Sequence, residues 1–180
     1  MALVLWRFWA YSFLGYLLEK VFAAVTHAEK QGRKCFLLMP MCPVYGLGVL
    51  AVLALPPNFT DSFWELALWG GLTATAVEYA VHWGYERLLG VAFWDYRAMP
   101  WNLQGRICLP FSAVWALLLA VLLPRAEAYI TPLIAAIPTG VTYGMLLLFT
   151  ADAVCSARFL RVTGDTEGLR FQRFSRSDSH

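Results

Sequence analysis

Residues 107–124 read ICLPFSAVWALLLAVLLP, a stretch of the chain without a charged side chain. The whole sequence has the same character, because 59% of its 180 residues are hydrophobic and only 14% are charged. Ordinary soluble domains carry about 25% charged residues, so this composition argues against a soluble enzyme, which would need more polar surface. The 16% of aromatic residues also excludes a disordered chain. The sequence therefore predicts an all-α integral membrane protein.

About five stretches of the chain are long and apolar enough to cross a bilayer, which takes about 20 helical residues. We expect the membrane-spanning helices within residues 6–26, 35–60, 63–86, 107–124 and 127–152. The second helix should be broken near its cytoplasmic end, since Pro40 and Pro43 each lack a backbone donor. Residues 1–160 then form a polytopic transmembrane helical bundle, and residues 161–180 form a polar, loose cytoplasmic tail.

The basic residues predict the orientation of this bundle. Lysine and arginine are frequent in residues 28–34, 87–106 and 158–176, whereas residues 56–62 have none and residues 125–128 have Arg125 alone. Because basic loops stay in the cytoplasm, we expect the N-terminus outside and the C-terminus in the cytoplasm. The cysteines then lie at or near the reducing cytoplasmic face, and they are Cys35, Cys42, Cys108 and Cys155. This location predicts no structural disulfide.

Two acidic residues fall inside the expected spans at similar depth. With 1.5 Å of rise per helical residue, Glu19 lies about 10 Å and Glu78 about 12 Å inside the bilayer. An ionised acid at such a depth costs roughly 3 kcal/mol, so both are candidate cavity residues. His82 shares the helix face of Glu78, and the pair favours a proton or cation site. The alternatives are a structural ion pair between Glu78 and an arginine, and a histidine that only reaches the interface.

The stretch PMCPVYGLG, residues 40–48, is the most irregular part of the sequence. Broken backbone is tolerated in a bilayer only where protein or water satisfies it. Transporters use such breaks to present helix ends to ligands, so Cys42 and Tyr45 are candidate cavity residues. The alternatives are a reoriented helix start, with Pro43 in the first turn, and a reactive thiol at Cys42.

The loop of residues 90–105 is aromatic rather than charged. Such a composition suits an interfacial or re-entrant segment, and we expect it to act as a lid or a docking element. Asp95, Asn102 and the following Arg106 complete the candidate site, with Asp95 either pairing with an arginine or capping a turn. Two ligands on one helix do not make a metal site, so we assign no metal. We also assign no cofactor and no catalytic residue.

Several short motifs occur in order along residues 8–119. They are Ser12, Gly15 and Glu19; Pro40, Cys42-Pro43, Tyr45-Gly46 and Gly48; Glu78-Tyr79; Trp94-Asp95-Tyr96; Asn102 with Gly105-Arg106-Ile107-Cys108-Leu109; and Trp115. Together they resemble the putative ABC-transporter type IV membrane family, also described as putative ABC transporter permeases. Met39 and Ala116 depart from the family pattern, which has glycine at both positions. The resemblance implies a small multi-helix protein of the bacterial inner membrane.

The leading functional hypothesis is a permease-like membrane component with a cytoplasm-facing polar cavity, acting in solute transport. A phosphate-binding loop needs a lysine that follows glycine, and Lys20, Lys30 and Lys34 do not. Any ATP hydrolysis would therefore belong to a separate ATPase subunit. The alternatives are an intramembrane enzyme that uses the same cavity, with Cys42, Glu78 or His82 as a reactive group, or a non-catalytic assembly partner. The net charge of +2 argues against nucleic-acid binding, and a chain of this size could form a homo-oligomer.

Overall fold

The computed structural model describes residues 1–26 and 35–169. Its main helices are α1 (Ala2–Val25), α2 (Pro43–Leu53), α3 (Phe63–Glu65), α4 (Gly71–Leu89), α5 (Leu109–Ala135) and α6 (Thr139–Thr163). A π-helical turn, η2 (Leu66–Gly70), joins α3 to α4, and η1 (Pro57–Phe59) and η3 (Glu167–Leu169) are short 3-10 turns. β1 (Asn102–Leu103) and β2 (Ile107–Cys108) form an antiparallel hairpin. The prediction of an all-α fold is confirmed.

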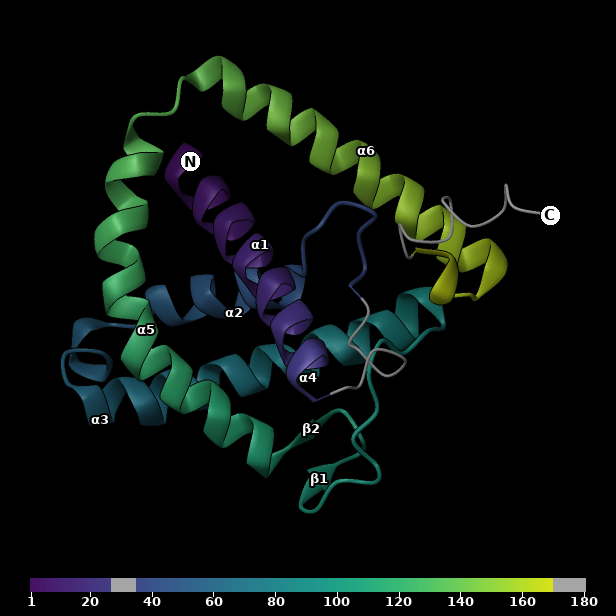
Figure 1. Ribbon diagram of the computed structural model, residues 1–180, viewed down its shortest axis with the longest axis horizontal. Coiled ribbons are helices and arrows are strands. Elements are labelled where there is room, and N and C mark those ends of the chain that lie inside the picture. The colour runs from purple at the N-terminus through teal and green to yellow at the C-terminus, as the bar shows by residue number, and fades with distance from the viewer. Residues whose placement is uncertain (27–34, 170–180) are drawn as a thin grey trace.

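The helices are arranged around α1 (Figure 1). α2 packs across α1, α4 packs on α2, and α5 contacts both α4 and α1. α5 and α6 form an arch around the N-terminal half of α1, and α6 contacts the other helices sparsely. Four helices, α1, α2, α4 and α5, therefore form the packed body of the protein, with α6 at its edge.

The helices α1 and α2 lie so close together that a side chain at either of two glycines would overlap the other helix. A Cβ atom on Gly15 of α1 would overlap the ring of Tyr45, and a Cβ on Gly46 of α2 would overlap the carbonyl of Phe8 and the hydroxyl of Ser12. Just before α2 begins, the backbone N–H of Cys42 donates to the Ser12 carbonyl at 2.9 Å. Small residues on both surfaces allow this contact, as they do between membrane helices generally.

The second predicted segment folds as a half-length helix. α2 has 11 residues and spans only ~16 Å at 1.5 Å per residue, about half of a ~30 Å hydrocarbon core. It begins at Pro43, because proline fits the first turn and continues poorly from a preceding helix. The non-helical residues before it are held by Asp152 of α6, whose carboxylate accepts from the N–H groups of Leu38 at 3.2 Å and Met39 at 2.9 Å.

The boundary predicted between the fourth and fifth segments is wrong. α5 continues through Pro124 to Ala135, and the turn to α6 occupies residues 136–138. The predicted loop of residues 125–128 is helical, so Arg125 and Glu127 lie on α5. Proline inside a helix removes one hydrogen bond and bends the helix rather than ending it here, and Figure 1 shows the bend in α5.

The third predicted segment forms one continuous helical run from Phe63 to Leu89 through α3, η2 and α4. Its start is a capping box, in which Ser62 Oγ accepts from the Glu65 N–H at 3.2 Å and Glu65 Oε2 accepts from the Ser62 N–H at 3.0 Å. Its end is Gly90, in the left-handed conformation at φ 69°. Glu65 therefore has a local structural role outside the candidate site.

The predicted loose tail is partly ordered. α6 runs to Thr163, and Leu169 is buried against Val91, Phe93 and Leu160. Leu169 therefore packs on the segment that precedes the hairpin, and α6 continues to Thr163, which corrects the expectation that the chain is loose from Arg161 onward. The remaining residues of the predicted tail, 170–180, lie outside the described part of the chain, and the domain division itself stays a prediction.

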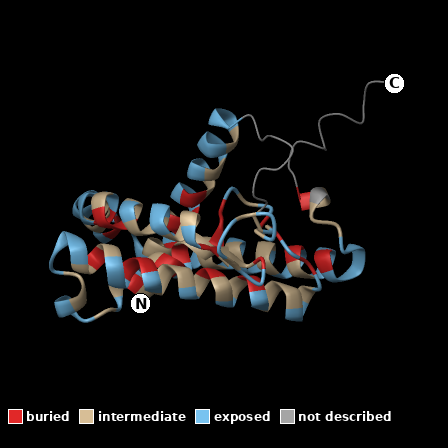
Figure 2. Ribbon diagram, turned by 90° about the horizontal axis from the view of Figure 1, so that it is seen from below, coloured by how far each residue is buried: buried red, intermediate tan, exposed pale blue. Residues whose placement is uncertain are grey.

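Exposed residues occur along all the long helices (Figure 2). Many of them are large and apolar, and examples from four helices are Val21, Leu72, Leu117 and Leu147. Soluble monomers rarely expose contiguous apolar surface of this kind. Among the described helices, α5 is the one that is long and apolar enough to cross a membrane by length and composition alone. The five-span bundle therefore stays a prediction.

The expectation of no disulfide is also wrong. Cys35 and Cys42 form a disulfide, with their Cα atoms 4.9 Å apart. The bend that contains Pro40 folds the chain back on itself and brings the two cysteines together. The sequence argument considered the redox compartment and not this local geometry. Cys108, which is buried, and Cys155, which is exposed, are free thiols.

Alkylation of the denatured, unreduced protein should modify Cys108 and Cys155 and leave one bridge between Cys35 and Cys42. The bridged sulfurs carry no thiol for the reagent to attack. Mass spectrometry of the peptides measures this directly. Reduction before alkylation should expose all 4 cysteines. Modification of all of them without reduction would contradict the disulfide.

Replacing Asp152 with Ala should lower the free energy of unfolding by about 1–3 kcal/mol, because two N–H groups lose their shared acceptor. Equilibrium unfolding in mixed micelles measures the change. Thr150→Ala on the same helix is the control, since the Thr150 hydroxyl donates to the carbonyl of Leu146 within α6 at 2.7 Å. Equal stability of the two variants would contradict the role given to Asp152.

Candidate functional site

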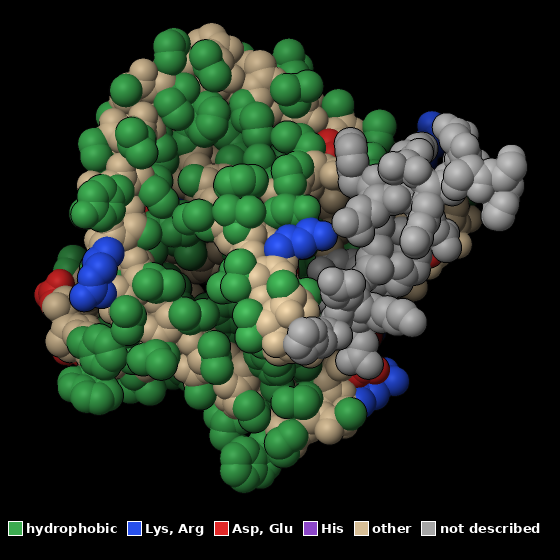
Figure 3. Space-filling view, viewed as in Figure 1, with side chains coloured by type: hydrophobic (Ala, Val, Ile, Leu, Met, Phe, Trp, Pro, Cys, Tyr) green, Lys and Arg blue, Asp and Glu red, His purple; other side chains and the backbone are tan. Residues whose placement is uncertain are grey.

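A cavity of about 560 Å³ lies between α1, α2, α4 and α5. On the face drawn in Figure 3 the surface is mostly hydrophobic and is hollowed between α1 and α5. The walls along most of its length are aliphatic, with Leu14 and Leu18 from α1, Val49 from α2, and Leu118 and Leu122 from α5. The cavity is therefore an apolar chamber formed by the packed body of the protein.

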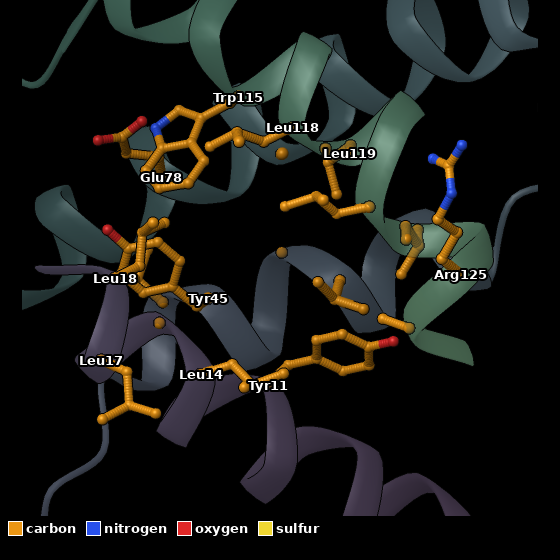
Figure 4. A pocket seen from close by; sticks show the side chains of 18 of the residues that line it. Tyr11, Leu14, Leu17, Leu18, Tyr45, Glu78, Trp115, Leu118, Leu119 and Arg125 are labelled. Carbon is orange, nitrogen blue, oxygen red and sulfur yellow. The ribbon is translucent and has the colours of Figure 1, made fainter. Parts of the chain in front are cut away.

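Polar groups gather at one end of the cavity, where Glu78, Tyr45 and Trp115 lie close together (Figure 4). Glu78 is only 4% exposed, and its Oε1 accepts a hydrogen bond from the Tyr96 hydroxyl at 3.2 Å. The Tyr45 hydroxyl donates to Oε1 of Glu19. The rings of Tyr45 and Trp115 meet edge to face, with centroids 4.9 Å apart and planes at 71°.

A second polar cluster lies at the opposite end, near Tyr11 and Arg125 (Figure 4). The Tyr11 hydroxyl donates to Glu127 Oε1 at 2.8 Å, and Arg7 forms an ion pair with the same carboxylate. The Thr131 hydroxyl donates to Glu127 Oε2 at 3.0 Å. Sequence reasoning missed this cluster because it placed Glu127 in a loop. The available signal was Arg7, a charge inside an otherwise apolar run that required a partner.

The predicted polar cavity therefore needs correction. Its middle is lined by aliphatic side chains, and its polar groups are confined to the two ends. The sequence argument used only the expected depth of Glu19 and Glu78 in the bilayer. It could not show that leucines of α1 and α5 line the same cavity. Glu78 and Tyr45 line the chamber directly, whereas Glu19 joins that end through Tyr45.

The remaining polar candidates form a network that fastens the hairpin segment to α4. The carbonyl of Trp94 can only accept, so Nε2 of His82 donates to it at 2.9 Å. Arg106 donates through Nε to Glu86 Oε2 at 2.8 Å and through NH1 to the Tyr79 hydroxyl at 3.0 Å. The hydrogen bond to Glu86 raises the pKa of the Arg106 guanidinium. Arg106 is thus a partner of Glu86, and Tyr79 is a member that sequence reasoning did not assign to the site.

Asp95 and Asn102 shape the loop between α4 and α5. Asp95 Oδ1 accepts from the Arg97 N–H at 2.9 Å, the geometry of a side-chain-stabilised turn. The amide of Asn102 donates to the Met99 carbonyl at 2.9 Å, and its oxygen accepts from the Gly105 N–H at 3.1 Å. Of the two alternatives for Asp95, the structure favours the turn, with a loose ion pair to Arg97 at 3.8 Å.

Two of the residues named for the enzyme alternative, Cys42 and His82, are engaged in other bonds. Cys42 is bonded to Cys35, so it has no thiol to act as a nucleophile. His82 uses Nε2 to hold the Trp94 carbonyl. Within residues 1–26 and 35–169, no group of three or more histidine, cysteine, aspartate or glutamate side chains is placed to hold a metal ion.

These features define an all-helical protein with an apolar chamber closed by polar clusters at its ends. A family model described as putative ABC-transporter type IV matches residues 6–157, and the chain belongs to this family. The match extends past the motifs at residues 8–119 to include Glu127 and Asp152. No match was found among the curated proteins or among the solved structures.

Replacing Gly105 with Ala should lower the free energy of unfolding by about 1–2 kcal/mol. Gly105 has φ 72°, and an added Cβ would lie 2.7 Å from both the Arg97 side chain and the Asp95 carboxylate. Gly84→Ala is the matched control, since nothing lies within 4 Å of the added Cβ inside α4. That change should stabilise the helix by about 1 kcal/mol. Equilibrium unfolding measures both changes. If both variants shift the free energy of unfolding in the same direction, the packing described for the hairpin is contradicted.

Proposed function

We propose that this protein is a permease-like integral membrane component whose chamber between α1, α2, α4 and α5 holds a solute during its passage through the bilayer. The observation that carries the proposal is the chamber itself, an apolar volume with Glu78 buried at one end. Membership of a transporter-related family supports the same class of function. Buried acids in membrane helices commonly mark the pathway of a substrate or ion.

The proposal places the helical body in the membrane as a five-span bundle. α1, the α3–α4 run, α5 and α6 would each cross, and α2 would cross together with the non-helical residues before it. Such a break is tolerated in a bilayer only where protein satisfies the backbone. Hydrogen bonds within the protein satisfy this part of the backbone. The N–H groups of Leu38 and Met39 donate to Asp152, and the N–H of Cys42 donates to the Ser12 carbonyl.

The proposed orientation has the N-terminus outside and the C-terminus in the cytoplasm of a bacterial inner membrane. The distribution of basic residues supports it. The bridge between Cys35 and Cys42 opposes it, because disulfides persist on the oxidising side of such a membrane. The alkylation experiment described above therefore bears on orientation as well as on the bridge.

The energy source would be a separate ATPase subunit, in keeping with the family description. Such a subunit needs a docking element on the membrane component. The hairpin is our candidate, because Trp101 at its base and Leu103 in β1 are largely exposed while Arg106 in its turn is bound to Glu86 of α4. An oligomer of this chain remains a further proposal, and the lipid bilayer is the surrounding partner.

Filling the chamber should abolish transport. Leu118→Trp places a larger ring in the chamber, whereas Leu147→Trp adds the same ring on an exposed face of α6. The assay uses membrane vesicles from cells of the source organism in which the gene is deleted and each variant is expressed instead. Such vesicles retain any ATPase partner. We expect protein-dependent uptake of at least one of three probes, which are ethidium, carboxyfluorescein and N-phenylnaphthylamine. Uptake should be lost in Leu118→Trp and kept in Leu147→Trp.

Two outcomes would overturn the proposed function. One is the absence of protein-dependent movement of any probe, with and without ATP, from vesicles that contain folded protein. The other is equal transport by the two tryptophan variants, which would show that the chamber is not on the pathway.

A further inference from the structure

The chamber is lined mostly by apolar side chains, and Arg125 lies at the end away from Glu78 (Figure 4). We infer that the chamber binds a phospholipid of the surrounding membrane, with an alkyl chain between α1 and α5 and its phosphate outside the apolar part, at Arg125. This inference rests on the proposed function, and it names the substrate class of the same site.

The alkyl chain is assigned from the lining of the chamber. Leu14 and Leu18 of α1, Val49 of α2, and Leu118 and Leu122 of α5 form its walls. Its volume of about 560 Å³ lies within the range of ordinary ligand sites. A polar group placed between such walls would lose its hydrogen bonds to water without replacement. The walls therefore favour a hydrocarbon chain.

The chamber opens sideways between α1 and α5. Leu17 and Val21 of α1 and Leu122 of α5 line it, and they are also 41%, 60% and 51% exposed. Figure 3 shows the hollow on this face of the protein. In the proposed membrane placement the opening faces the lipid, so an alkyl chain can enter from the bilayer while its head group stays outside the chamber.

The phosphate is assigned from Arg125, which is exposed on α5. It lies ten residues before the end of this helix at Ala135, about 15 Å from that end. Its NH1 donates to the Val121 carbonyl of the same helix, but within residues 1–26 and 35–169 it forms no ion pair with an acid. A charge within a membrane span is costly unless a counter-charge accompanies it. An anion at the opening of the chamber would supply that counter-charge.

The acid nearest in sequence to Arg125 is already engaged. Glu127 forms an ion pair with Arg7 and accepts hydrogen bonds from Tyr11 and Thr131. Arg125 therefore gives this end of the chamber an excess of positive charge. A guanidinium has several N–H donors besides the one used on Val121, and it binds phosphate through paired, charge-assisted hydrogen bonds.

The opposite end fixes the direction of the lipid. Glu78 accepts from the Tyr96 hydroxyl, and the Tyr45 hydroxyl donates to Glu19, so the acids at that end already have donors from the protein. A phosphate placed there would lie near carboxylates and be repelled by them. The charges of the two ends therefore favour a lipid with its phosphate at Arg125.

The test uses the whole protein in micelles of a neutral detergent and three lipids with the same chains. They are dioleoyl phosphatidate, dioleoylglycerol and dioleoyl-trimethylammonium-propane, present together at equal concentrations. Native mass spectrometry counts the lipids that stay bound. Phosphatidate should bind at least about fivefold more tightly than the other two. Equal binding of the three lipids, or preference for the cationic one, would overturn the inference.

Variants of Arg125 locate the preference. Arg125→Gln should lower phosphatidate binding about fivefold, to the level of dioleoylglycerol, whereas Arg125→Lys keeps the charge and should keep most of the preference. The matched control is Arg158→Gln, at an exposed arginine of α6, which should bind phosphatidate as the unmodified protein does. A phosphatidate preference that survived Arg125→Gln, or was lost equally in Arg158→Gln, would contradict the assignment of the head group.

The chamber variants locate the chain. Leu118→Trp fills the chamber and should reduce the binding of both phosphatidate and dioleoylglycerol, whereas Leu147→Trp on α6 should not. Equal lipid binding by these two variants would place the lipid outside the chamber and overturn the inference.

The two proposals can fail separately. A phosphatidate preference that depends on Arg125 and Leu118, without movement of any probe in vesicles, would keep this inference and reject transport. Probe movement that is lost in Leu118→Trp, with no phosphatidate preference in micelles, would keep transport and reject this inference.

Discussion

The contact between Gly15 and Tyr45 is the constraint on which the polar end of the chamber depends. The Tyr45 ring occupies space that any side chain at position 15 would fill. This close approach sets the hydroxyl of Tyr45 against Glu19 and its ring against Trp115. Three helices therefore meet at one aromatic residue, because a glycine allows two of them to touch. A bulkier residue at position 15 would separate α1 from α2 and displace Tyr45 from the chamber.

The half-length of α2, which begins at Pro43, leaves backbone donors that other parts of the protein must satisfy. A helix that begins within the body exposes backbone donors before its first turn, and these need acceptors wherever water is absent. Ser12 of α1 supplies one acceptor with its carbonyl, and Asp152 of α6 supplies two more bonds with its carboxylate. α6 packs sparsely on the other helices, so Asp152 gives this peripheral helix a specific attachment to the segment that leads into the chamber.

The sequence predicted the helical class, most helical segments and several residues at the polar end, because composition and spacing report burial and helix faces. It failed where tertiary context decides local structure. Pro124 was taken as a helix end, although a proline can lie inside a helix at a bend, and this choice concealed Glu127. The partners of Asp95 and Asn102 depend on the exact turn of the hairpin. The bridge between Cys35 and Cys42 depends on a bend that no periodicity describes.

α5 is the wall that touches both polar clusters. Trp115 lies at one end of the chamber and Glu127 is bound to Tyr11 at the other, with Pro124 between them on the same helix. The missing donor of proline removes one hydrogen bond that would otherwise hold the two halves of α5 in line. The hydrogen-bond ladder of α5 is therefore interrupted between the two clusters. Any mechanical coupling of one end to the other along this wall has to pass through the bend at Pro124, and a change in that bend would alter the separation of the two ends.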